Sequence, residues 1–281
     1  MKLLASLICL LVFNNCVLAK DLAQKQNSKP YKRIVALTSL SADLIVSLDR
    51  EVLVGVPGTK LTNNDQRFIG IKRISSGRSQ PNIESIVSLQ PDLVVGATGF
   101  HSKTLSSLKR LGINTLEFRI DRWNKLEKSV DVLSSMIPNN GSLKNKINSI
   151  CPKVSQSNNA KQKSLNILIL AGITPKLSPA KQSWSGSLLQ RMGLTNATDS
   201  LTGNSQFSGY ITMSNERLLT IKPDIVLTIN PSGGSDSQYS SLKKYFPNLN
   251  KKDFYGMDYY GLINPGSLGS IAKACSTLKQ L

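Results

Sequence analysis

The strongest constraint on the fold of this chain is an internal duplication. Residues 82–95 have the pattern of a short helix, a Pro-Asp turn and a buried apolar strand, and residues 215–227 repeat this pattern. Pro91 and Pro223 lie 132 positions apart and mark the displacement. This period is far longer than the roughly 20–50 residues of solenoid repeats, so we expect two lobes of one architecture in tandem.

The strands of the two lobes are short, continuous apolar runs. An apolar strand at 33–37 has its counterpart at 166–170, and further runs lie at 93–95 and 225–227. Such runs alternate with helical segments in each lobe, which is typical of parallel strands covered on both faces. The sequence therefore predicts an α/β protein of two lobes, each with a mainly parallel sheet flanked by helices.

A linker region separates the two lobes. Residues 123–137 carry apolar side chains at helical spacing, and a second helical run covers 142–150, with Pro138 and Gly141 between the two. We divide the chain accordingly into an N-terminal lobe at 20–122, an interlobe helix and loop at 123–162, and a C-terminal lobe at 163–281.

The first 19 residues have the pattern of a signal peptide. Lys2 precedes an apolar stretch at 3–13, and Val-Leu-Ala at 17–19 is a suitable cleavage site before Lys20. The apolar stretch is shorter than the roughly 20 residues of a membrane-spanning helix. We expect an exported, periplasmic protein. An alternative is a lipoprotein anchored through Cys16, but the Phe-Asn-Asn before it is unlike a lipobox.

The chain is strongly basic, with a net charge of +18, or +17 without the signal peptide. Its basic residues are scattered, and no aromatic-interleaved stripe, zinc-ligand spacing or basic helix accompanies them. Nucleic-acid binding is therefore disfavoured. The charge is either a solvated basic surface or a means of attracting anionic ligands.

Two cysteines, Cys151 and Cys275, remain after the signal peptide. An even number in an oxidising compartment favours a disulfide, which would close a loop of 124 residues and stabilise the fold by roughly 4–5 kcal/mol. The alternative is two separate buried thiols.

Several segments, in this order and spacing, resemble one family. They are the strand at 33–37 followed by Thr-Ser-Leu-Ser-Ala-Asp at 38–43, Leu-Val-Gly-Val at 53–56, residues 81–95, and Gly-Ser-Leu-Leu-Gln-Arg-Met-Gly-Leu-Thr-Asn-Ala at 186–197. They resemble the periplasmic substrate-binding proteins of ABC transporters for iron-siderophores, haem and cobalamin, over nearly the whole mature chain. The resemblance implies two lobes joined by one long linker helix and a ligand held between them with little hinge motion. We also expect a monomer. Pro138 departs from a single long helix.

The candidate ligand-binding residues follow from the strand ends. In open parallel sheets ligands lie outside the carboxyl ends of the strands, and two facing lobes would place these ends around one cleft. The polar and aromatic side chains that we expect there are Arg78, His101, Arg119, Trp184, Tyr210, Tyr259 and Tyr260.

Each of these residues has a functional and a purely structural interpretation. Arg78 and Arg119 suit carboxylate or catecholate oxygens, or are surface cations. Trp184, Tyr259 and Tyr260 stack on ligand rings, with the two tyrosines also able to supply a phenolate to iron, or all three are partly buried by lobe packing. His101, the single histidine, is a cleft contact, a haem-iron ligand, or an ordinary loop residue.

Glu84 and Glu216 occupy equivalent positions in the duplication. Each follows a helix-capping residue, so one interpretation is a carboxylate stabilised by the positive end of a helix. The resemblance implies a different role, in which one glutamate on each lobe docks on arginines of an ABC permease with two-fold symmetry. Their equivalence favours docking.

The leading functional prediction is an extracytoplasmic binding protein that captures a ferric siderophore and delivers it to an ABC permease. Cobalamin or another corrinoid is the second choice and haem the third. The ligand is the metal chelate itself, and no cofactor or covalent chemistry is implied. A secreted α/β hydrolase is a distant alternative, because no nucleophile, base and orienting group can be assembled.

Overall fold

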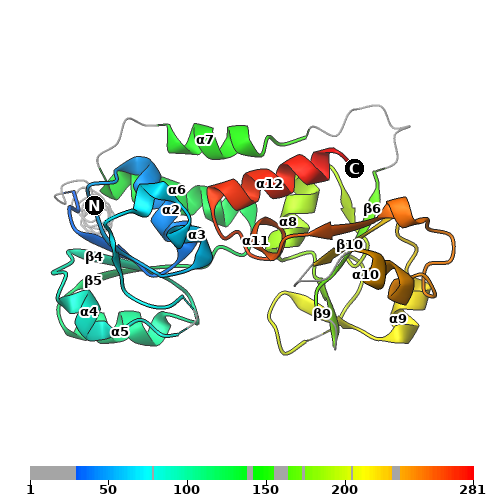
Figure 1. The fold of residues 1–281 in the computed structure, drawn as a ribbon, viewed down its shortest axis with the longest axis horizontal. Helices are drawn as coiled ribbons and strands as arrows, with labels where there is room; N and C mark the ends of the chain where they lie inside the picture. The colour runs from blue at the N-terminus through cyan, green and yellow to red at the C-terminus, as the bar shows by residue number, and fades with distance from the viewer. Residues whose placement is uncertain are drawn as a thin grey trace, which may run out of the picture.

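The fold is described from a computed structural model, over residues 30–77, 79–137, 142–154, 164–172, 175–203, 205–229 and 235–281. Figure 1 shows two lobes side by side, with α7 and α12 running across their upper edge. The expected signal peptide, Cys16 and Arg78 lie outside the described residues. Within the described ranges, no helix combines the length and the apolar character needed to cross a membrane.

The first lobe is a five-stranded parallel sheet with the order β3-β2-β1-β4-β5. Its strands are β1 (Ile34–Ala36), β2 (Leu53–Val56), β3 (Lys72–Arg73), β4 (Leu93–Ala97) and β5 (Asn114–Phe118). Its helices are α2 (Ser39–Leu48), α3 (Lys60–Asn63), the 3₁₀ helix η1 (Gln66–Phe68), α4 (Ile83–Val87) and α5 (Ser102–Arg110).

The second lobe has a parallel sheet with the order β11-β10-β6-β8 and a separate antiparallel pair, β7 and β9. Its strands are β6 (Asn166–Leu170), β7 (Lys176–Pro179), β8 (Thr195–Asn196), β9 (Tyr210–Met213), β10 (Ile225–Ile229) and β11 (Phe254–Met257). Its helices are α8 (Trp184–Arg191), α9 (Asn215–Thr220), α10 (Ser235–Leu242), η2 (Lys251–Asp253), α11 (Tyr259–Leu262) and α12 (Leu268–Lys279).

The two sheets bear out the duplication. The order β2-β1-β4-β5 in the first lobe corresponds strand for strand to β8-β6-β10-β11 in the second. The aspartate of each Pro-Asp turn makes the same kind of contact. Asp92 Oδ1 accepts the Arg33 N–H at 3.0 Å, and Asp224 Oδ2 accepts the Asn166 N–H at 2.7 Å. Each aspartate thus ties the start of one strand to its neighbour.

The linker consists of two helices, α6 (Trp123–Met136) and α7 (Leu143–Ile150), and not of one long helix. Helix α6 ends just before Pro138, and Ile137 is already extended, because the residue before a proline is pushed out of the helical region. The buried side chains Leu126, Val130 and Leu133 of α6 belong to a core cluster that contains residues of both lobes. Helix α6 therefore lies in the seam between the lobes.

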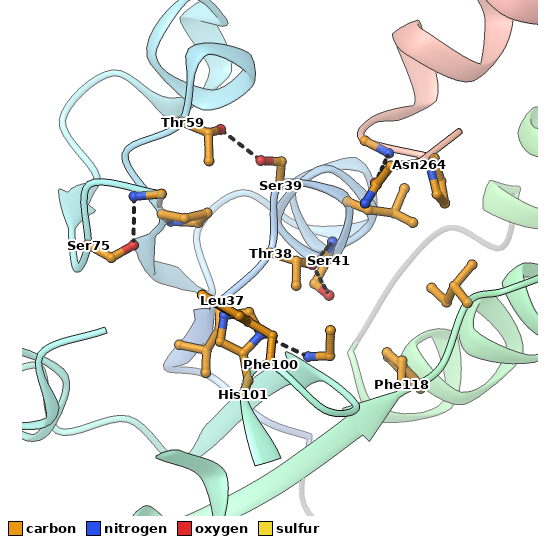
Figure 2. A pocket seen from close by; sticks show the side chains of 18 of the residues that line it. Leu37, Thr38, Ser39, Ser41, Thr59, Ser75, Phe100, His101, Phe118 and Asn264 are labelled. Carbon is orange, nitrogen blue, oxygen red and sulfur yellow. Dashed lines mark hydrogen bonds between the residues drawn. The ribbon is translucent and has the colours of Figure 1, made fainter. Parts of the chain in front are cut away.

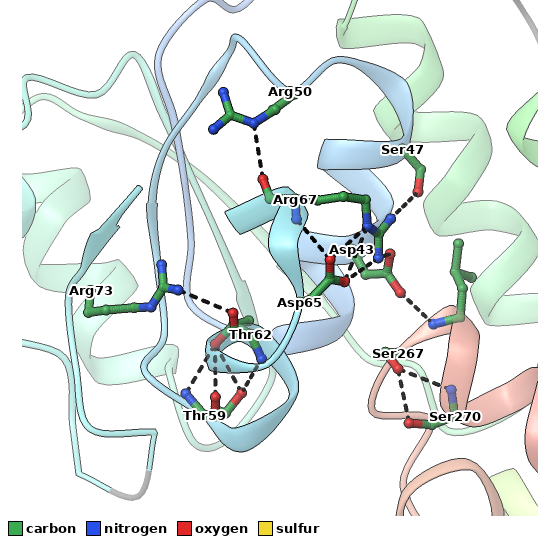
Figure 3. A network of polar contacts seen from close by, with 11 residues as sticks. Asp43, Ser47, Arg50, Thr59, Thr62, Asp65, Arg67, Arg73, Ser267 and Ser270 are labelled. Carbon is green, nitrogen blue, oxygen red and sulfur yellow. Dashed lines mark hydrogen bonds and ion pairs between the residues drawn. The ribbon is translucent and has the colours of Figure 1, made fainter. Parts of the chain in front are cut away.

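Two further contacts attach the C-terminal helix α12 to the rest of the molecule. Asp43 of α2 is buried; its Oδ2 accepts the Leu268 N–H at 2.6 Å and its Oδ1 pairs with Arg67 at 2.8 Å (Figure 3). The expected disulfide is present and joins Cys151, after α7, to Cys275 in α12. Helix α12 thus connects the first lobe, the linker and the second lobe.

Candidate functional site

A cavity of about 250 Å³ lies at the carboxyl ends of the strands of the first lobe, where the sheet topology predicted a ligand site. Residues at and after the ends of the five strands β1 to β5 form most of its wall, and Tyr260 of α11 together with the loop after α11 closes it from the second lobe (Figure 2). We call it the cleft cavity. Its lining residues are Leu37, Thr38, Ser39, Leu40, Ser41, Pro57, Thr59, Ser75, Gly77, Ser79, Gly96, Ala97, Phe100, His101, Phe118, Ile120, Tyr260, Asn264, Pro265 and Gly266.

Hydroxyl groups make up one side of the cleft cavity. Thr38 caps α2 and Thr59 caps α3, so both hydroxyls stand where a strand ends and a helix begins. Thr38 Oγ1 accepts the Ser41 N–H at 3.0 Å, and Ser39 Oγ lies 2.7 Å from Thr59 Oγ1. Hydroxyls both donate and accept hydrogen bonds, so this wall suits amide, hydroxyl or ether groups of a ligand.

His101 lines the cleft cavity and is only 6% exposed. Its Nδ1 accepts the Ala97 N–H at 3.2 Å, and burial lowers its pKa below the ordinary value, against an opposite effect of Glu117. A neutral imidazole with an occupied Nδ1 lone pair carries its proton on Nε2. His101 is therefore arranged as a hydrogen-bond donor, and iron ligation through Nε2 would require the other tautomer and loss of the bond from Ala97.

Aromatic rings border the cleft cavity. Phe100 is 52% exposed and stands edge-on to the His101 ring at 4.9 Å, and Tyr260 is 40% exposed. Tyr259 packs edge-on against Tyr260 at 5.4 Å but does not line the cavity. The exposed faces of Phe100 and Tyr260 are available for stacking on a flat ligand.

The structure does not bring Trp184 to the cavity. Trp184 is 4% exposed, stacks on Trp123 at 6.0 Å, and donates its indole N–H to the carbonyl oxygen of Gly261 at 2.7 Å. It lies in the packing between the lobes, which was the structural alternative considered for it. Because Gly261 directly follows the cavity-lining Tyr260, Trp184 supports α11 beside the cavity.

Of the two arginines predicted for the site, Arg119 is described, and it is not among the cavity-lining residues. Arg119 directly follows β5, its side chain is 61% exposed, and its Nε donates to Asp121 Oδ2 at 2.8 Å. Its Nη2 also reaches Ser208 Oγ of the second lobe at 3.4 Å, so Arg119 lies at the edge of the cleft. Arg78 falls outside the described residues, between the lining residues Gly77 and Ser79.

Tyr210 and Tyr259 lie outside the cleft cavity but near each other. Burial raises the pKa of Tyr210, and the charge of Tyr259 raises it further. Burial also raises the pKa of Tyr259. In both cases burial disfavours the charged phenolate. Across the described part of the chain, no group of three or more His, Cys, Asp or Glu residues is placed to hold a metal ion.

Glu84 and Glu216 are exposed, and each stands in the first turn of its helix, α4 or α9. Figure 1 shows these helices at the lower edge of the two lobes, opposite α7 and α12. A hydrogen bond from Ser214 lowers the pKa of Glu216, so its carboxylate is charged at neutral pH. The two acids thus lie on one edge of the molecule, away from the core.

Most residues of the cavity wall are not recognisable as ligand contacts from the sequence. The wall hydroxyls, Phe100, Phe118 and Asn264 are not among the seven ligand-binding residues predicted from the sequence. The sequence signal for Phe100 and Phe118 is their position, because Phe100 follows β4 and Phe118 ends β5. Asn264 carries no such signal, since the loop after α11 approaches the first lobe only through tertiary packing.

Two parallel-sheet lobes with a cavity at the strand ends define a cleft-binding protein. The chain belongs to the periplasmic binding protein family, whose sequence profile matches residues 34–244. It is 23% identical over 236 residues to a cobalamin-binding protein of Halobacterium salinarum, an alignment that covers 80% of this chain and 60% of that protein. It is 25% identical over 218 residues to the high-affinity heme uptake system protein IsdE of Staphylococcus aureus, covering 76% and 72%.

Solved structures have the same fold. An ABC transporter substrate-binding protein from Listeria monocytogenes superimposes with a TM-score of 0.67 at 20% identity, covering 90% of this chain and 98% of that one. The chain thus spans less than two thirds of the cobalamin-binding relative but nearly all of the Listeria protein. Membership of this family implies an extracytoplasmic location.

Proposed function

We propose that this protein captures a metal chelate outside the cytoplasm and delivers it to an ABC permease, without catalysing a reaction. The observation that carries the proposal is the cleft cavity, which lies at the carboxyl ends of β1, β2, β4 and β5 and is closed by the loop after α11. The names of the relatives support it, since they are binding proteins for cobalamin and heme.

The lining favours a neutral chelate. No Asp, Glu, Lys or Arg occurs among the described lining residues, and the wall offers hydroxyls, one amide and aromatic rings. An anion buried against these described residues would lose its hydration without gaining a charged partner among them; Arg78, between the lining residues Gly77 and Ser79, lies outside the described part of the chain. A corrinoid carries amide groups around a flat metal-binding ring and fits this chemistry. We therefore rank a corrinoid above the ferric siderophore that the net charge suggested.

The size of the cavity indicates how such a ligand would lie. About 250 Å³ is less than the roughly 300–1,000 Å³ of pockets that enclose a drug-sized ligand. The cavity would therefore take one edge or side arm of a chelate. The ring system would extend into the cleft along Phe100 and Tyr260, which are half-exposed.

A ferric siderophore is the second candidate, because Arg119 presents an exposed guanidinium at the cleft edge and the chain has a net charge of +18. Haem ranks third, because Nδ1 of His101 already accepts a backbone hydrogen bond. Export through cleavage after residue 19, a periplasmic monomer, and docking of Glu84 and Glu216 on the permease complete the proposal.

Fluorescence titration tests the proposal directly. The chain has two tryptophans, and Trp184 bonds Gly261, the neighbour of the cavity-lining Tyr260, so a coloured ligand in the cleft quenches their emission. We expect saturable quenching by cyanocobalamin, and weaker or no quenching by haemin and a ferric tris-catecholate. Tight binding of the ferric chelate alone would overturn the ranking, and saturable binding of none of the three would contradict chelate capture.

A matched pair of variants locates the ligand. Phe100→Ala removes a cavity-lining ring that is 52% exposed, and Tyr255→Ala removes a ring on β11 that is 36% exposed and outside the cavity lining. We expect about a tenfold loss of affinity for Phe100→Ala and no change for Tyr255→Ala. Equal losses would place the ligand elsewhere.

A further inference from the structure

Each glutamate of the proposed docking pair has an exposed apolar neighbour on its own helix. Val87 follows Glu84 by three residues on α4 and is 39% exposed. Leu219 follows Glu216 by three residues on α9 and is 61% exposed. Residues three apart in a helix lie on the same face, so each helix presents one acid and one apolar side chain together.

The pairing follows the duplication. Val87 and Leu219 are 132 positions apart, the displacement that separates Glu84 from Glu216. Among the exposed large apolar side chains of the described ranges, they are the pair related by this displacement.

The residues just before them, Ile86 and Leu218, are fully buried. The two helices are thus anchored to their lobes by one apolar residue and leave the next one exposed. An exposed Leu by itself is ordinary, but the same exposed position in both lobes, beside the same acid, has no role in either core.

We infer that Glu84 with Val87 and Glu216 with Leu219 form two equivalent half-sites for a membrane protein with two-fold symmetry, each of whose subunits presents a basic side chain beside an apolar pocket. The inference rests on the proposed docking of the glutamates and extends it. Helices α4 and α9 lie on the same edge of the molecule, opposite the edge that α7 and α12 cover (Figure 1), so one partner can contact both.

The acidic and the apolar residues contribute differently to such an interface. Charge complementarity orients the partners and weakens as salt rises, because exposed charges are screened beyond about 8 Å at physiological ionic strength. Burial of Val87 and Leu219 adds affinity that salt does not screen. A half-site that combines an acidic and an apolar side chain therefore retains part of its affinity at high salt.

The experiment measures binding of the purified, full mature chain to right-side-out membrane vesicles from the cells in which this sequence is found, with liposomes of the extracted lipids as the background. The tested variants are V87S/L219S and E84K/E216K. The control is I69S/V154S, which changes two side chains that are 67% and 41% exposed and lie outside α4 and α9.

We expect wild type and control to bind vesicles well above the liposome background, and V87S/L219S to bind about tenfold or more weakly at both low and high salt. E84K/E216K should lose binding mainly at low salt, and each single apolar variant should show a partial loss. Chelate affinity of all variants should equal that of wild type, which shows that each variant is folded.

Three results would overturn the inference in distinguishable ways. If V87S/L219S binds like wild type while E84K/E216K does not, the apolar half-sites are wrong and the glutamate docking stands. If E84K/E216K also binds like wild type, or wild type does not exceed the liposome background, the proposed docking itself is wrong. If sedimentation shows a dimer of the wild type that V87S/L219S abolishes, this edge binds a second copy of the chain.

Discussion

Replacement of Asp43 by alanine tests how the C-terminal helix is attached to the first lobe. Asp43 is 2% exposed, and its carboxylate accepts the Leu268 N–H at 2.6 Å and pairs with Arg67 at 2.8 Å. A buried hydrogen bond to a charged group contributes about 1.5–3 kcal/mol. The ion pair adds at most about 1 kcal/mol, because Arg67 is 43% exposed and keeps Asp65 as a partner. Asp43→Ala should therefore lower the free energy of unfolding by about 2–4 kcal/mol.

Two further variants separate the hydrogen bond from the charge. Asp43→Asn keeps an oxygen that can accept the Leu268 N–H, so the loss should be about 1–2 kcal/mol. Asp65→Asn changes a more exposed partner of Arg67, whose carboxylate bonds Arg67 rather than α12, and should cost less than about 1 kcal/mol. Urea unfolding measures all three losses, and hydrogen exchange at the Leu268 amide reports the attachment of α12 directly.

The relative losses of unfolding free energy in the three variants test this reasoning. If Asp43→Ala costs less than about 1 kcal/mol, or leaves exchange at the Leu268 amide unchanged, the carboxylate does not hold α12. If Asp65→Asn costs as much as Asp43→Ala, the stabilisation resides in the surface ion pair and not in the link between α2 and α12.

Three further predictions concern the cavity histidine, the loop after α11 and the disulfide. Burial lowers the pKa of His101 below its ordinary value of 6.5, so the unfolded chain binds the proton more tightly and the free energy of unfolding should fall as pH drops below about 6.5. His101→Gln should reduce this dependence of the unfolding free energy on pH, and an unchanged dependence would contradict the prediction. A Cβ on Gly261, at φ +95°, would clash with a backbone carbonyl in α12, whereas at Gly112, where φ is also positive, the space is open. Gly261→Ala should therefore lower the melting temperature by several degrees more than Gly112→Ala, and equal effects of the two variants would contradict the clash. Replacing both Cys151 and Cys275 by alanine should lower the free energy of unfolding by about 2–5 kcal/mol, measured by urea titration, and a loss below about 1 kcal/mol would show that the disulfide adds little.

The sequence by itself determined the two-lobe architecture and the location of the cleft. The apolar run in 166–170 coincides with β6, and that at 93–95 with the start of β4, because a parallel strand covered on both faces must be continuously apolar or nearly so. The Pro-Asp turns at Pro91 and Pro223 revealed the duplication, which the matching strand orders bear out. The position of a site at the carboxyl ends of strands then follows from topology, without any knowledge of side-chain contacts.

Only the tertiary structure decided which of these strand-end residues share a cavity. Trp184 and Tyr260 have the same aromatic character in the sequence, yet one is buried between the lobes and the other lines the cavity. Asp43 meets a backbone amide 225 residues away. The periodicity of apolar residues in the sequence describes one helix or strand at a time, whereas these contacts depend on how α6, α8 and α12 pack in the seam between the lobes. The sequence thus determines the helices and strands and their order, and the packing between the lobes determines which residues form the site.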